Sequence, residues 1–221
     1  MLINCNTLLL FEWFYCIIGQ AMKKYQNVIG VTGPPGSGKT YLSRYIGSAT
    51  GIEVIEMDKH YRELLNEPFV KFFMGNSGKK DVGFTDTTDK FDKINFVKKI
   101  EIELLKIIGN RMLKNLTKGD RPVIVDFALL PELPVAKKFG ANYLVEGSDK
   151  LRHLKISERE QISVDAAESI VRVTNKIVDY NKLQYDAVIN NQGYQGIPKE
   201  VQKIVEELNK KYNSLGIGCG I

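Results

Sequence analysis

The sequence predicts an α/β fold, a doubly wound parallel sheet of about five strands with a helical insertion and a lid. Three observations support this prediction. Short, apolar, β-branched runs alternate along the chain with segments of helical periodicity. A glycine-rich turn joins the first of these runs to the first helical segment. Two consecutive helical patterns separate the second apolar run from the third, and that stretch is too long for a simple crossover, which indicates an inserted subdomain.

The expected strands and helices alternate in a regular order. Gly51 closes the turn between the first helix and the second strand, Ser163 is a typical helix N-cap, and Pro198 stands at the first turn of the last helix. The strands are expected at 27–32, 52–56, 123–125, 141–145 and 186–190. The helices are expected from 41, over 59–75 and 90–116, from 163 to about 183, and from 198 to about 212.

This order predicts one main domain at 25–213, with the helical insertion, expected to bind an acceptor, at 59–119 and a lid region at 149–175. A short tail, 214–221, follows it. An apolar extension, 1–24, precedes it. Residues 7–22 are mostly apolar, but no basic residue comes before them and Glu12 interrupts them. We favour an extension or a true start at Met22, and a membrane anchor or signal sequence remains the alternative if residues 1–21 are translated.

Composition favours a soluble protein that binds a small anionic molecule. The 221 residues carry a formal net charge of +5, and the basic residues are scattered, which argues against nucleic-acid binding. The three cysteines, Cys5, Cys16 and Cys219, have no metal-ligand spacing, which fits a reducing, cytoplasmic location. We expect a monomer or a small homo-oligomer.

The turn after the first strand has the form G-x-x-x-x-G-K-[ST], the P-loop or Walker A motif. Its glycines let successive backbone N–H groups surround the oxygens of a polyphosphate. Lys39 is expected to reach the β- and γ-phosphates of ATP, and the Thr40 hydroxyl to bind Mg²⁺ at a helix N-terminus. The strand, loop and helix together indicate a P-loop NTPase-type fold. The residues expected to contact the nucleotide here are Gly33, Pro34, Pro35, Gly36, Ser37, Gly38, Lys39, Thr40 and Tyr41.

Two aspartates follow apolar strands at the edge where ligands bind in open α/β sheets. Asp126 is expected to orient Mg²⁺ or its water, and the alternative is a solvated residue at the end of a strand. Asp58 is expected to accept the proton of an attacking hydroxyl or to align it, although it could also cap the helix that follows.

A basic cluster lies in the charged segment before Ser163. Arg152 and Arg159 are expected to stabilise the charge that develops during phosphoryl transfer, and Lys155 lies between them. A solvated helix face is the competing interpretation. His60 and His153 have no partner at metal or triad spacing, so we expect both at the surface.

Several segments resemble the dephospho-coenzyme A kinase family over most of 28–208. The resemblance lies in the phosphate loop, the run Val-Ile-Glu-Met-Asp at 54–58, the strand and turn at 125–132, the lid segment 159–163 and the strand and loop at 185–193. It implies that Asp58 is the catalytic aspartate and that Asn191 and Gly193 lie in a loop on the adenine side. It also implies transfer of the γ-phosphoryl group of ATP to the ribose 3′-hydroxyl of dephospho-coenzyme A, with Mg²⁺.

The chain departs from the family pattern in the acceptor and lid regions. Lys106 to Gly109 stand where the family has His-Pro, Ala128 replaces a proline, and the arginine and glutamine of the lid helix are absent. A nucleoside kinase of the uridine type or another small-metabolite kinase therefore stays open as an alternative. A nucleotide-binding regulatory module without turnover is a third possibility.

Overall fold

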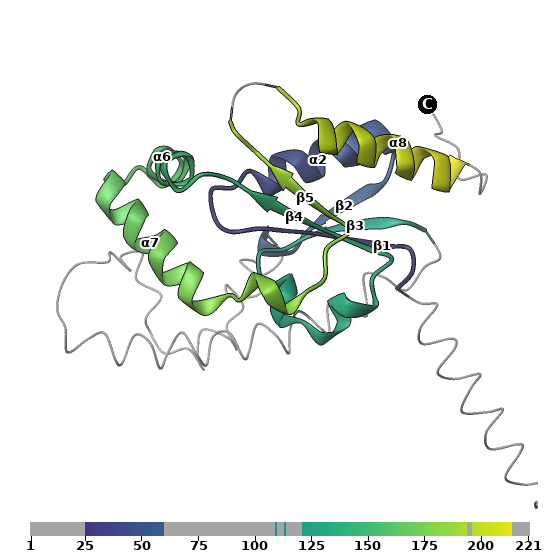
Figure 1. Cartoon of the computed structure of the whole chain (residues 1–221), viewed down its shortest axis with the longest axis horizontal. Coiled ribbons are helices and arrows are strands. Elements are labelled where there is room, and N and C mark those ends of the chain that lie inside the picture. The colour runs from purple at the N-terminus through teal and green to yellow at the C-terminus, as the bar shows by residue number, and fades with distance from the viewer. Residues whose placement is uncertain (1–24, 60–108, 110–112, 114–120, 194–195, 214–221) are drawn as a thin grey trace, which may run out of the picture.

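The computed structural model describes residues 25–59, 109, 113, 121–193 and 196–213 (Figure 1). Within this part of the chain, five parallel strands form one sheet in the order β2-β3-β1-β4-β5. The strands are β1 (Val28–Thr32), β2 (Glu53–Glu56), β3 (Val123–Asp126), β4 (Ala141–Glu146) and β5 (Ala187–Asn190). The predicted α/β fold with a parallel sheet of about five strands is therefore confirmed. β1 is central, and its residue Ile29 pairs with Ile124 of β3 and Ala141 of β4.

Alternate residues of the strands feed two hydrophobic cores, as the pleat of a sheet requires. On one face, Ile29 and Val31 pack with α2 (Lys39–Thr50) and α8 (Lys199–Asn213), which lie together over the sheet in Figure 1. On the other face, Val28 and Val125 pack with two short 3₁₀ helices, η1 (Leu130–Glu132) and η2 (Pro134–Lys138), and with the segment that follows a third, η3 (Tyr180–Lys182).

A pair of helices stands at the end of the sheet to which β4 points (Figure 1). They are α6 (Asp149–Glu160) and α7 (Val164–Ile177), and they share a small core of their own built on Ile156, Ala167 and Val171. Ser148 caps α6 by accepting the N–H of Leu151. Ser163 caps α7 by accepting the N–H of Ala166, as its position in the sequence predicted.

The boundaries of two helices differ from the expectation. α7 ends at Ile177 rather than near 183, because Val178 is extended and the Asp179 side chain caps η3 by accepting the N–H of Asn181. α6 was not singled out as a helix, since only Arg152 and Ile156 are buried in it and no apolar period marks it. The last helix begins at Lys199, and its first turn bonds the Pro198 carbonyl, close to the prediction.

Several expectations lie outside the described residues: the extension 1–24, most of the insertion 59–119, the tail 214–221, and His60. Gly109 and Leu113, from the expected helix 90–116, are described. Both are helical, and Leu113 is fully buried against the core that contains Val28. Within the described ranges, no helix has both the length and the apolar character that crossing a membrane requires.

Candidate active site

The loop between β1 and α2 depends on glycine at two positions. Gly36 and Gly38 have φ values of 78° and 88°, in the left-handed region that side chains disfavour. A Cβ on Gly36 would also lie 2.7 Å from the Arg152 carbonyl oxygen, and one on Gly38 would overlap the Asn191 amide. Gly38 is the N-cap of α2 and offers no side-chain cap. The first N–H groups of α2 therefore have no acceptor within the helix, and free N–H groups at a helix N-terminus suit an anion.

Two side chains from distant elements hold this loop from outside. The buried amide of Asn191, just after β5, donates to the Ser37 carbonyl over 2.7 Å and accepts the N–H of Gly193 over 3.1 Å. The buried guanidinium of Arg152, from α6, donates to the Pro35 carbonyl over 3.0 Å. The loop conformation is therefore fixed by contacts with β5 and α6 as well as by its own sequence.

Lys39 and Asp58 meet across the site. The Lys39 Nζ lies 3.4 Å from an oxygen of Asp58, and the Lys39 side chain is about nine-tenths buried while that of Asp58 is half-exposed. Asp58 is already in the first turn of the helix that follows β2, so it is not the N-cap that the sequence left open. The pair brings the expected phosphate-binding ammonium beside the expected proton acceptor.

Asp126 is the most deeply buried charged group of the site. Burial raises the pKa of its carboxyl, while the nearby Lys39 charge and a hydrogen bond with Thr40 lower it. Its Oδ1 atom is buried and has no hydrogen-bond partner. It is not the solvated strand-end residue of the alternative interpretation. An unpartnered carboxylate oxygen beside a threonine hydroxyl is the donor set that Mg²⁺ prefers, so the residues present fit that ion.

The basic cluster divides into three different environments. Arg152 is committed to structure, because besides Pro35 it bonds Asp149 over 2.9 Å and Asn175 over 3.1 Å, and burial lowers its pKa. Arg159 is exposed and pairs with its neighbour Glu160. Lys155 points at the loop, since its Nζ would lie 3.4 Å from a Cβ on Gly38.

Lys155 is the site residue that the sequence undervalued. Burial lowers the pKa of its ammonium, which shows that the charge is partly removed from water. In the sequence, Lys155 is marked only by its position between two arginines. The structure of α6 shows that it faces Gly38. Tyr41, expected to contact nucleotide, is 64% exposed, and Gly193 lies against Leu151 of α6.

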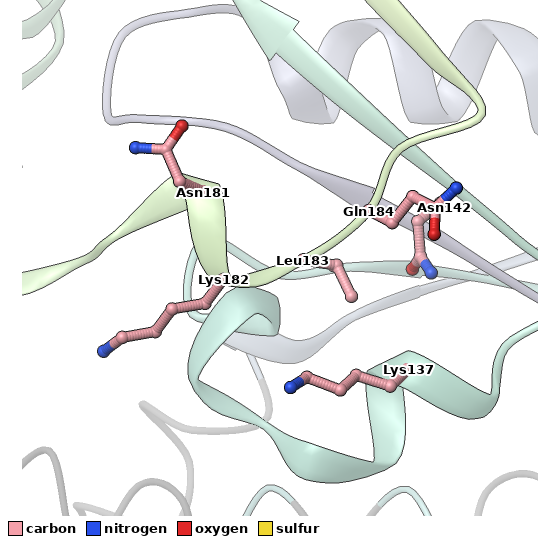
Figure 2. A pocket seen from close by; sticks show the side chains of 6 residues that line it. All are labelled: Lys137, Asn142, Asn181, Lys182, Leu183 and Gln184. Carbon is pink, nitrogen blue, oxygen red and sulfur yellow. The ribbon is translucent and has the colours of Figure 1, made fainter.

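A polar hollow of about 420 Å³ lies away from these residues (Figure 2). It lies where η2, the start of β4 and the segment leading into β5 meet, whereas the phosphate loop follows the carboxyl end of β1. None of the predicted site residues lines it. Its walls are Lys137, Asn142, Asn181, Lys182, Leu183 and Gln184. Among the described residues, no group of three or more His, Cys, Asp or Glu side chains could hold a metal ion.

The chain is similar to two curated dephospho-CoA kinases. The chain is 27% identical over 191 residues to a dephospho-CoA kinase of Fusobacterium nucleatum, covering 82% of this chain and 98% of the relative. It is 27% identical over 202 residues to a dephospho-CoA kinase of Borrelia garinii, covering 82% of this chain and 94% of the relative. No family model matches the sequence. The resemblance to dephospho-CoA kinases predicted from the motifs is therefore confirmed.

Solved structures share the fold. A dephospho-CoA kinase from Campylobacter jejuni matches with a TM-score of 0.50 and 21% identity, covering 84% of this chain and 98% of that one. A shikimate kinase from Bacteroides thetaiotaomicron matches with a TM-score of 0.51 and 12% identity, covering 85% of this chain and 96% of that one. The P-loop kinase fold is thereby confirmed, and the relatives named here are kinases that use small-molecule acceptors.

Proposed function

We propose that this chain is a divergent dephospho-CoA kinase, which transfers the γ-phosphoryl group of ATP to the ribose 3′-hydroxyl of dephospho-coenzyme A. One observation carries the proposal: four residues from three separate places in the sequence converge beside one phosphate loop, namely Lys39 with Thr40, Asp58 and Asp126. The names of the two curated relatives, similar over 82% of the chain, support dephospho-coenzyme A as the acceptor.

On the donor side, the loop at 33–40 binds the phosphates of ATP through its backbone N–H groups. Lys39 adds a charge that is strong because its side chain is mostly buried. Asn191 and Arg152 keep the loop in its binding shape, so little reorganisation is needed when phosphates arrive.

Thr40 and Asp126 would hold Mg²⁺. Thr40 would supply its hydroxyl and Asp126 its unpartnered buried oxygen, directly or through water. A bound ion would supply positive charge that neutralises the phosphates during transfer. Burial of the Asp126 carboxylate is unfavourable in the protein alone, but it leaves a carboxylate oxygen available to bind a cation.

On the acceptor side, Asp58 receives the proton of the attacking hydroxyl. Its carboxylate is half-exposed, so an acceptor can reach it, and Lys39 keeps it next to the phosphate loop. As the hydroxyl oxygen attacks the γ-phosphorus, the bond from that phosphorus to the β–γ bridging oxygen breaks. The proton passes to an Asp58 oxygen, and ADP leaves.

In this proposal the lid consists of the helices α6 and α7, which cover most of the expected lid region 149–175. Lys155 lies against the loop and stabilises charge on the phosphates, while Arg152 joins the loop to the lid through Pro35 and Asn175. Arg159 contributes only in a conformation in which it leaves Glu160. Because ATP is the donor, we place the enzyme in the cytoplasm.

The proposal is tested by ADP release from the full chain with Mg²⁺ and ATP. Dephospho-coenzyme A, uridine and shikimate are supplied separately as acceptors, and ADP release without acceptor is the baseline. We expect stimulation by dephospho-coenzyme A alone. Stimulation by uridine or shikimate instead would assign another acceptor. ATP binding with no stimulation by any of the three would leave a nucleotide-binding module in place of a kinase.

A further inference from the structure

Tyr180 brings a phenol hydroxyl into the site from an element that the proposed chemistry does not use. It is the first residue of η3, in the connection between α7 and β5. Its hydroxyl lies 3.4 Å from the Ala128 carbonyl oxygen, which also accepts the Thr32 hydroxyl over 3.2 Å. Thr32 directly precedes the phosphate loop, and Ala128 is two residues after Asp126. The phenol is therefore placed where the strands that carry the loop and the buried aspartate end.

The backbone that carries Tyr180 is fixed from two sides. The Tyr185 hydroxyl donates to the Tyr180 carbonyl over 2.7 Å. Glu132, from η1, accepts two bonds from Lys182 over 2.7 and 3.0 Å and the N–H of Asp179 over 3.3 Å. A side chain supported on rigid elements in this way is preorganised, so its hydroxyl keeps one position without the help of a ligand.

The hydroxyl itself is less firmly held than its backbone. Its distance to Ala128 is long for an O–H···O bond, and that carbonyl already accepts from Thr32. Burial raises the pKa of Tyr180, so the phenol stays protonated and able to donate at neutral pH. Among the described residues, the charges of Arg152 and Asp58 act on its pKa in opposite directions: Arg152 lowers it and Asp58 raises it. The hydroxyl can therefore turn to another oxygen at small cost.

We propose that Tyr180 binds the phosphoryl acceptor, donating a hydrogen bond from its hydroxyl to an acceptor oxygen and so holding the reactive hydroxyl beside Asp58. The inference rests on the proposed function, because it requires a hydroxyl-bearing acceptor at Asp58. The acceptor class that fits is a molecule with two neighbouring polar oxygens, such as a ribose, since one oxygen would bond Tyr180 while the other faces Asp58.

The test compares Tyr180→Phe with Tyr143→Phe in the full chain. Tyr143 is a matched control, because it too is a buried tyrosine whose pKa burial raises, to about 12, but it packs on the other face of the sheet with α8. We expect Tyr180→Phe to lower kcat/KM for dephospho-coenzyme A about tenfold, as the loss of one hydrogen bond does. The KM for ATP and the Tm should stay unchanged, and Tyr143→Phe should leave kcat/KM unchanged.

The outcomes separate the two proposals. If the wild type turns over dephospho-coenzyme A and Tyr180→Phe has the same kcat/KM, the role of Tyr180 is overturned and the kinase function stands. Equal losses in both variants with lowered Tm also overturn it, since they show a structural role. If the wild-type chain neither turns over nor binds dephospho-coenzyme A in calorimetry, the proposed function fails, and this inference fails with it.

Discussion

Lys39 and Asp58 form an ion pair with 3.4 Å between Nζ and the carboxylate, and it joins the first residue of α2 to the residue that follows β2 by two positions. In the proposed function, the pair sets the phosphate-binding ammonium and the proton acceptor side by side. Because Lys39 is mostly buried and Asp58 is half-exposed, the first is suited to hold phosphate in place and the second to meet an acceptor that enters from solvent.

Asp58→Asn separates catalysis from nucleotide binding. The amide cannot accept the proton, so we expect kcat to fall by roughly two orders of magnitude or more. ATP affinity should be retained or slightly increased, because Lys39 loses a competing anion. Steady-state kinetics and calorimetry measure the two quantities. Glu53→Gln, which changes an exposed carboxylate on β2, the strand that precedes Asp58, is the control. An Asp58→Asn enzyme with wild-type kcat would exclude Asp58 as the base.

Lys39→Ala should remove both properties. With the ammonium gone, we expect no measurable turnover and a Kd for ATP weaker by about tenfold or more, as befits a charge-assisted contact. Arg44→Ala, five residues further along α2, removes an exposed cation that pairs with Glu56 and should change neither. Equal ATP affinity in the Lys39 variant and the wild type would show that the loop backbone binds phosphate without this side chain.

Asp126→Asn should raise the stability of the ligand-free protein and reduce its response to Mg²⁺. The folded-state pKa of Asp126 is raised, so ionising it costs stability, and the contribution of this group is lost as pH rises through that pKa. At pH 7 the ligand-free variant should therefore be more stable than the wild type, with a higher Tm. The increase should shrink as the pH falls toward about 4. Thermal melts with and without Mg²⁺ and ATP measure both effects.

The same variant should lose the added stabilisation that Mg²⁺ gives in the presence of ATP. Ser37→Ala is a useful comparison, because its hydroxyl is another buried group without a hydrogen-bond partner but is not a carboxylate. A lower Tm at pH 7 for Asp126→Asn, or an undiminished Mg²⁺ effect, would contradict the role given to this residue.

Features that depend on a short stretch of sequence could be predicted, whereas features that depend on contacts between distant residues could not. The five strands and the loop were predictable, because β-branched runs and the spacing of Gly33, Gly36 and Gly38 are properties of short segments. α6 was not predictable, since its buried residues are Arg152 and Ile156 rather than an apolar stripe. The reach of Asn191 to Ser37 spans 154 positions of sequence and could be seen only in three dimensions.

Asn191→Ala should destabilise the conformation of the phosphate loop, although Asn191 lies outside the loop. The change leaves the buried Ser37 carbonyl without its donor, which costs about 1–3 kcal/mol. We expect a lower Tm and a higher KM for ATP, with a smaller effect on kcat. Asn190→Ala, its exposed neighbour at the end of β5, is the matched control. Identical melting and KM values for the two variants would show that the loop holds its shape unaided.

Lys155→Met and Arg159→Met distinguish two candidates for the lid cation. Lys155 lies against Gly38, so its loss should lower kcat by about a hundredfold, as the loss of a charge-stabilising donor does. Arg159 is exposed beside Glu160. If Arg159 acts when the lid closes, its replacement lowers kcat more than ATP affinity. An unchanged kcat would show that Arg159 is a surface residue without a role in catalysis. Wild-type kcat in Lys155→Met would remove Lys155 from the site.

The most direct test of the central claim is the product formed from dephospho-coenzyme A. The full chain is incubated with Mg²⁺, ATP and dephospho-coenzyme A, and the products are separated and identified by mass spectrometry and phosphorus NMR. We predict one added phosphate, located on the ribose 3′-oxygen, with one ADP formed for each product molecule. Recovery of unmodified dephospho-coenzyme A, while ATP binds at the phosphate loop, would contradict the account.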